Sequence, residues 1–170
     1  MRRALDALYD AAAYVAAFFL IMTLVWVLVG IGGRFFNFYV RGTDAYAGYA
    51  MAGCAFLALA HTLKRGEHIR VELVLQKAGP RLRRALQLWS YGAATLLAAL
   101  FAFYSVRLAW QSYTFNDVST ANDATPLWIP QIGMAIGTIV LFVAFADELV
   151  LEWRGERRPP GGGEEATHHE

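Results

Sequence analysis

Four long apolar stretches, joined by shorter polar connections, dominate the chain. They cover residues 11–33, 45–63, 85–106 and 124–146, and none contains Asp, Glu, Lys or Arg. A helix of about 20 mostly apolar residues crosses a hydrocarbon core of about 30 Å. In lipid only helices and closed barrels satisfy the backbone, and these stretches are too long and too uniformly apolar for barrel strands. The pattern therefore predicts an all-α membrane protein with four transmembrane helices.

The connection between the second and third stretches contains a shorter apolar pattern. At helical spacing it carries Val71, Val74, Leu75 and Ala78, with charged residues between them. Such a pattern is typical of an amphipathic helix that lies in the membrane interface, here over about residues 68–78. Gly79-Pro80 then ends this helix, and Pro80 suits the start of the next one.

Beyond the fourth stretch the sequence changes character. Residues 154–170 are charged and rich in Pro and Gly, which predicts a disordered tail. The remaining residues, 1–153, then form one four-helix domain. The N-terminal Met1-Arg2-Arg3 resembles the start of a signal peptide, but the apolar stretch after it is too long and lacks a cleavage site. We therefore expect a retained first helix.

The distribution of Lys and Arg predicts the orientation. Three of the fifteen basic residues lie near the first and third connections: Arg34, Arg41 and Arg107. The other twelve lie in the two termini and the second connection. Because cytoplasmic loops carry the excess of Lys and Arg, both termini should face the cytoplasm.

Composition narrows the function further. Only 17% of the residues are charged, against about 25% in soluble domains. The net charge of +1 argues against nucleic acid as a partner. Cys54 is the single cysteine, so no disulfide can form within the chain.

Charged side chains inside a membrane usually mark ion or proton pathways, and here the central turns of all four stretches lack them. A haem bundle needs paired histidines, a thiol oxidoreductase needs cysteine pairs, and a small drug exporter needs an embedded carboxylate. His61 lies alone near the end of the second stretch and is best explained by packing. Glu67, His68 and Glu72 match no standard metal site. The sequence thus predicts neither an enzyme nor a bound cofactor or metal.

Two short motifs are candidates for a subunit interface or an interfacial anchor. The first is the turn from Gly66 to Val71, in which His68 and Arg70 would lie at headgroup depth. A basic turn anchored to anionic lipid explains the same residues. The second opens the fourth helix and contains Pro126, Trp128 and Pro130. Pro126 suits a first helical position and Trp128 suits the interface, so a well-anchored helix start is sufficient to explain it.

The third candidate is the pair Gly133 and Gly137. Small residues four apart let two helix backbones approach closely. Packing within this chain and packing against another protein explain the pair equally well.

Taken in order, these features resemble a known family. The four helices, the Gly66-x-His68-Ile69-Arg70-Val71 turn, the helix ending at Pro80 and the Pro126–Pro130 motif are similar to the small membrane subunit of tripartite ATP-independent periplasmic (TRAP) transporters, the DctQ-like family. The likeness runs from about Tyr9 to Glu152. One departure is Gly133, where many relatives carry a proline.

The resemblance implies a non-catalytic scaffold. Its partners would be a large membrane subunit, which carries the substrate and sodium sites, and a periplasmic protein that captures an organic acid. The expected interface comprises the first two helices and the Gly66–Val71 turn. We expect the outer loops to meet the binding protein. An alternative is a free-standing homo-oligomeric channel or small transporter, in which Gly133 and Gly137 would mediate self-association.

Overall fold

The computed structural model describes residues 2–38, 40–64, 79–121 and 123–154. The predicted interfacial helix and the C-terminal tail lie outside these residues. The same holds for four of the candidate site residues: Gly66, His68, Arg70 and Val71.

Four helices make up the described structure: α1 (Arg2–Phe35), α2 (Thr43–Lys64), α4 (Pro80–Thr114) and α5 (Trp128–Arg154). Each is long and apolar enough to span a membrane, which confirms the all-helical, four-span prediction. With 34 and 35 residues, α1 and α4 are each about 50 Å long, well beyond the length that a bilayer requires.

The helix ends differ from the predicted ones. The first and third helices extend well past the charge-free stretches 11–33 and 85–106. The fourth begins at Trp128, later than the expected residue 124. Pro126 therefore precedes this helix instead of occupying its first position, and it forms an isolated β-bridge with Val118.

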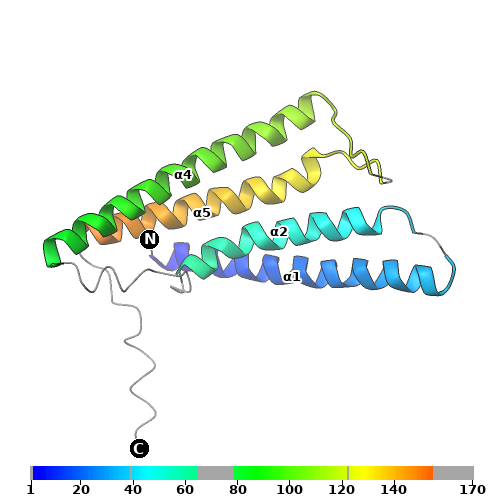
Figure 1. Ribbon diagram of the computed structural model, residues 1–170, viewed down its shortest axis with the longest axis horizontal. Coiled ribbons are helices and arrows are strands. Elements are labelled where there is room, and N and C mark those ends of the chain that lie inside the picture. The colour runs from blue at the N-terminus through cyan, green and yellow to red at the C-terminus, as the bar shows by residue number, and fades with distance from the viewer. Residues whose placement is uncertain (1, 39, 65–78, 122, 155–170) are drawn as a thin grey trace, which may run out of the picture.

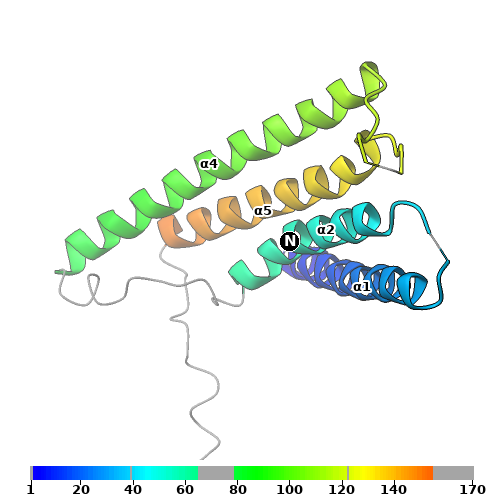
Figure 2. The same cartoon turned by 45° about the vertical axis from the view of Figure 1, so that its right-hand side comes forward.

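The helices form an open layer in the spatial order α1, α2, α5, α4, which differs from their order in the chain (Figures 1 and 2). The main packing is between α1 and α2, α2 and α5, and α4 and α5. At one end of the layer, called here the hairpin end, lie the α1–α2 turn and the loop of residues 115–127. The start of α1 and the end of α5 lie at the opposite end, called here the terminal end (Figure 1).

Small residues allow the central pair, α2 and α5, to pack closely. A Cβ on Gly137 would lie 2.6 Å from the carbonyl carbon of Phe56, so the two backbones are in direct contact. Towards the terminal end a core cluster joins α1, α2 and α5. Its buried members are Tyr9, Ala12, Ala60, Leu63, Val140, Leu141 and Ala144.

The two helices at the edges of the layer are less buried than the central pair. In the most apolar window of α1 only 6% of residues are buried inside the chain, against 33% in α5. Large apolar side chains such as Phe18, Leu24 and Leu28 are exposed on α1, and Leu96 and Phe103 are exposed on α4. These faces are covered by lipid or by another protein.

Candidate functional site

A groove opens between α1 and α5, with α2 as its floor, in the half of the layer nearer the hairpin end. It encloses about 320 Å³. The lining is mostly aromatic and aliphatic: Phe18, Phe19, Met22, Trp26, Tyr46, Tyr49, Ala50, Gly53, Thr125, Ile129, Pro130 and Gly133. We call it the α1–α5 groove.

Glycines shape the floor and wall of this groove. A Cβ on Gly133 would lie 3.7 Å from the Cα of Gly53, an ordinary van der Waals distance. A Cβ on Gly53 would touch the ring of Phe19 at 3.4 Å. Because Gly133 lines the groove, a larger side chain at this position would extend into it.

The loop of residues 115–127 closes the groove at the hairpin end. The Tyr49 hydroxyl donates a hydrogen bond to Oδ2 of Asp123 (3.1 Å), and the hydroxyl oxygens of Thr125 and Tyr46 lie 3.5 Å apart. Tyr46 also stacks on Trp26, with ring centroids 4.9 Å apart. The groove is therefore entered from the side, between α1 and α5, instead of from its end.

Hydrogen bonds to the carboxylate of Asp123 favour its ionised form. The hydroxyl of Thr125, followed by those of Ser119 and Tyr49, holds the pKa of Asp123 below its usual value, although desolvation acts in the opposite direction. A carboxylate that accepts hydrogen bonds in the folded state stabilises that state while it is ionised.

Acidification should therefore release the 115–127 loop from α2. The contribution of Asp123 is complete above the unfolded pKa of about 3.9 and is lost as the pH falls through the lower, folded value. Spin labels on cysteines at Ala121 and Gly48 should report a broader distance distribution at a pH below the folded pKa of Asp123 than at pH 7. In Asp123→Asn the distribution should already be broad at pH 7 and independent of pH. An unchanged wild-type distribution at low pH would contradict this assignment.

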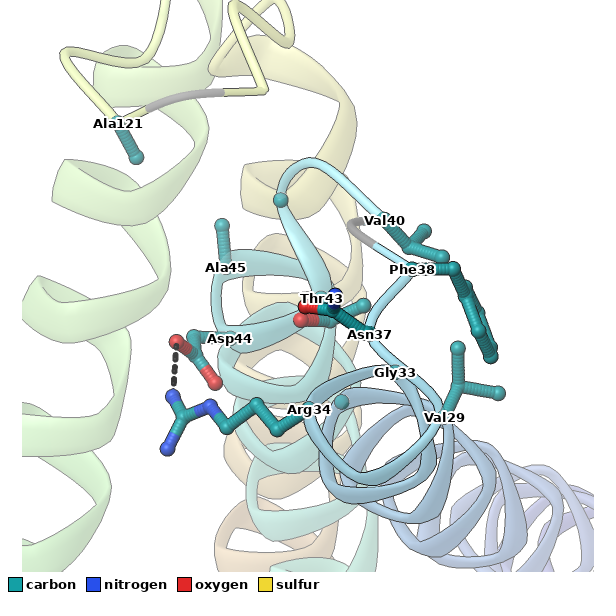
Figure 3. A pocket seen from close by; sticks show the side chains of 12 residues that line it. Val29, Gly33, Arg34, Asn37, Phe38, Val40, Thr43, Asp44, Ala45 and Ala121 are labelled. Carbon is teal, nitrogen blue, oxygen red and sulfur yellow. Dashed lines mark ion pairs between the residues drawn. The ribbon is translucent and has the colours of Figure 1, made fainter.

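A second cavity, called here the hairpin-end pocket, lies at the α1–α2 turn and encloses about 550 Å³. Among the lining residues that the structure describes, Arg34 and Asp44 carry formal charges, and their Nη2 and Oδ2 atoms are 3.9 Å apart. Figure 3 shows this pair on the side of the turn that faces α4, with Phe38 and Val40 on the other side. The side chains are 83% and 92% exposed, so the pair contributes little stability.

Within the described residues, the predicted site residues do not form one cluster but contact different parts of the protein. Pro130 and Gly133 line the α1–α5 groove, whereas Gly137 packs against α2. Trp128 packs edge-to-face on Tyr113 of α4, with ring centroids 5.6 Å apart. The Pro126–Pro130 motif therefore joins the end of α4 to the groove and does more than start a helix.

At the terminal end, His61 of α2 lies near Asp10 of α1, with Nδ1 and Oδ1 3.7 Å apart. No group of three His, Cys, Asp or Glu side chains that could hold a metal occurs in the part of the chain that the structure describes.

Most groove residues could not be identified from the sequence, because they come from three helices whose spatial order was unknown. The position of Trp26 in the sequence was a signal that could have indicated the groove. This residue lies well inside its apolar stretch, away from the interface where tryptophan is usually enriched. In the structure it forms part of the groove wall.

Comparison with known families decides the identity. The family model for tripartite ATP-independent periplasmic transporters, DctQ component, matches residues 22–155. The chain belongs to the DctQ family. No curated protein and no solved structure matches it. The matched region of this DctQ chain contains less than half of α1, from residue 22 to its end, and all of α2, α4 and α5, together with the hairpin-end pocket and most of the α1–α5 groove.

Proposed function

We propose that this DctQ chain is the non-catalytic scaffold of a sodium-coupled TRAP transporter that imports an organic acid, and that it braces the large membrane subunit. In this arrangement the chain lies in the bacterial inner membrane with both termini in the cytoplasm. The hairpin end then faces the periplasm, where the solute-binding protein docks.

The observation that carries this proposal is the open layer. The helix at one edge, α1, is almost entirely exposed, and the α1–α5 groove opens beside it. Lipid tails are as apolar as the groove, so helix association in a membrane depends on close van der Waals packing. The groove opens laterally and is lined in part by glycines, so it offers such packing to a bulky side chain from a neighbouring helix.

The closed end of the groove also favours a protein occupant. A lipid chain in this position would need its headgroup to reach the membrane surface, but Tyr46, Tyr49 and the loop of residues 115–127 cover that end. A side chain projecting from a helix of the large subunit needs only the lateral opening. We therefore place the partner on α1, α2 and α5, which includes the two helices expected from the sequence.

Filling the groove should separate the subunits. In Gly133→Leu the Cβ fits against Gly53, and the rest of the side chain occupies the groove. After co-expression, the large subunit should co-purify with this variant at less than about a tenth of the wild-type yield, as for loss of a central interface contact. Sodium-driven uptake in proteoliposomes that also receive the binding protein should fall in parallel.

Two variants serve as controls. Gly133→Ala adds only the Cβ that fits, so its complex should resemble the wild type. Leu96→Trp enlarges an exposed position on α4 and should also leave the complex intact. Wild-type yield with Gly133→Leu would contradict the groove assignment. Undiminished uptake without this chain would contradict the scaffold role, and transport by this chain alone would support the homo-oligomeric alternative.

A further inference from the structure

The Arg34–Asp44 pair is a feature that the bracing function does not use. It lies at the hairpin-end pocket, on the side of the turn that faces α4 (Figure 3). Both side chains are almost fully exposed, and their separation of 3.9 Å is at the outer limit for an ion pair. Each charge therefore retains capacity for a partner of its own.

The depth of the pair is that of a membrane surface. Arg34 lies in the last turn of α1 and Asp44 in the first turn of α2, at the ends of two candidate membrane spans. The adjoining aromatic side chains Phe35 and Phe36 are exposed. Lipid headgroups are the charged molecules present in quantity at this depth.

Two apolar stripes run from the charged pair towards the middle of the bilayer. On α1, Ile31 and Val27 share the face of Arg34, since they lie three and seven residues before it, and both are exposed. On α2, Gly48 and Met51 share the face of Asp44 and are also exposed, with open space beside Gly48. The two stripes lie on helices that pack against each other, and each begins at one member of the charged pair.

We propose that this surface binds a zwitterionic phospholipid whose headgroup joins a phosphate to a primary ammonium. Arg34 binds the phosphate oxygens and Asp44 binds the ammonium, while the acyl chains lie along the stripes of α1 and α2. Arginine is well suited to phosphate because its planar guanidinium can donate two parallel hydrogen bonds. An anionic headgroup that lacks the ammonium would leave Asp44 facing a negative charge.

The test is lipid retention. The full-length chain is reconstituted in nanodiscs of equal phosphatidylethanolamine and phosphatidylglycerol, extracted in mild detergent, and examined by native mass spectrometry. We expect retained phosphatidylethanolamine to exceed phosphatidylglycerol by about threefold to fivefold, the range for charge pairs at an exposed site. Arg34→Gln should lose most of the retained lipid. Asp44→Asn should lose the preference and retain the two lipids equally.

Arg41→Gln is the matched control, because Arg41 is an exposed cation of the same turn that does not line the pocket. It should retain lipid like the wild type. Equal retention of both lipids by the wild type, or unchanged retention in Arg34→Gln, would overturn the proposal. A further arm adds free phosphoethanolamine to the detergent-extracted chain. If it displaces the retained lipid at millimolar concentration, the site recognises a soluble headgroup and the lipid assignment fails; no displacement supports the lipid. These outcomes are independent of whether the large subunit binds in the α1–α5 groove.

Discussion

Replacing Gly137 with alanine should disrupt the contact between α2 and α5 and cause a large loss of stability. The new Cβ would lie 2.6–2.7 Å from the carbonyl carbon, the carbonyl oxygen and the Cβ of Phe56. Two of these atoms belong to the backbone, so a rotamer change cannot relieve the collision. Overpacking usually costs about 1–3 kcal/mol, and a backbone collision should lie at or above the upper end of that range.

Thermal unfolding in a mild detergent measures this effect. A lower melting temperature should be accompanied by loss of the contact between Phe56 and Phe101 of α4, whose rings lie 5.7 Å apart across α5. Gly133→Ala is the matched control, since it adds the same methyl one turn away at a position that accepts it. Equal melting temperatures for the two variants would show that the α2–α5 contact is not as close as described.

This pair of glycines illustrates what the sequence could and could not predict. The spacing of Gly133 and Gly137 indicated a close helix approach, but it left open whether the approaching helix belonged to this chain. The structure assigns Gly137 to the contact with α2 and places Gly133 at the edge of the α1–α5 groove. A motif describes one surface only, whereas the choice of neighbour depends on the spatial order of the helices.

The number and type of helices followed from hydropathy because a bilayer imposes one dominant constraint. Each apolar stretch must satisfy its own backbone, so four stretches predicted four helices. Helix ends were less predictable, because helices continue into water wherever their backbone hydrogen bonds persist. Asp6 and Asp10 lie within α1, and Arg107 lies about two turns inside the end of α4. Charges that marked the ends of apolar stretches therefore did not mark the ends of helices.

The candidate sites were less predictable than the fold. Arg34 entered the prediction only as a basic residue near a connection, because its approach to Asp44 depends on the tight α1–α2 turn. The α1–α5 groove depends on two long-range choices: the placement of α5 beside α2, and the return of the 115–127 loop onto Tyr49. Neither choice leaves a periodic pattern in the sequence.

The second large effect is expected at Gly42, because the loop of residues 115–127 packs closely against this glycine. Gly42 has a φ of +79°, a conformation that costs an L-residue about 1–2 kcal/mol. A Cβ at this position would also lie 2.6 Å from the Cβ of Asp123. In Gly42→Ala the loop must therefore move away from α2, and the hydrogen bond from Tyr49 to Asp123 is lost.

Adding about 1 kcal/mol for that hydrogen bond gives a local destabilisation of about 2–3 kcal/mol. Amide hydrogen exchange in the loop of residues 115–127 should accelerate more than about thirtyfold, while exchange in the α2–α5 contact should stay unchanged. Tyr49→Phe removes only the hydrogen bond and should accelerate exchange by about fivefold. Gly48→Ala, placed in open space on α2, should have no effect. If Gly42→Ala behaves like Tyr49→Phe, the loop tolerates the added methyl, and the close approach of Gly42 to Asp123 does not hold the loop against α2.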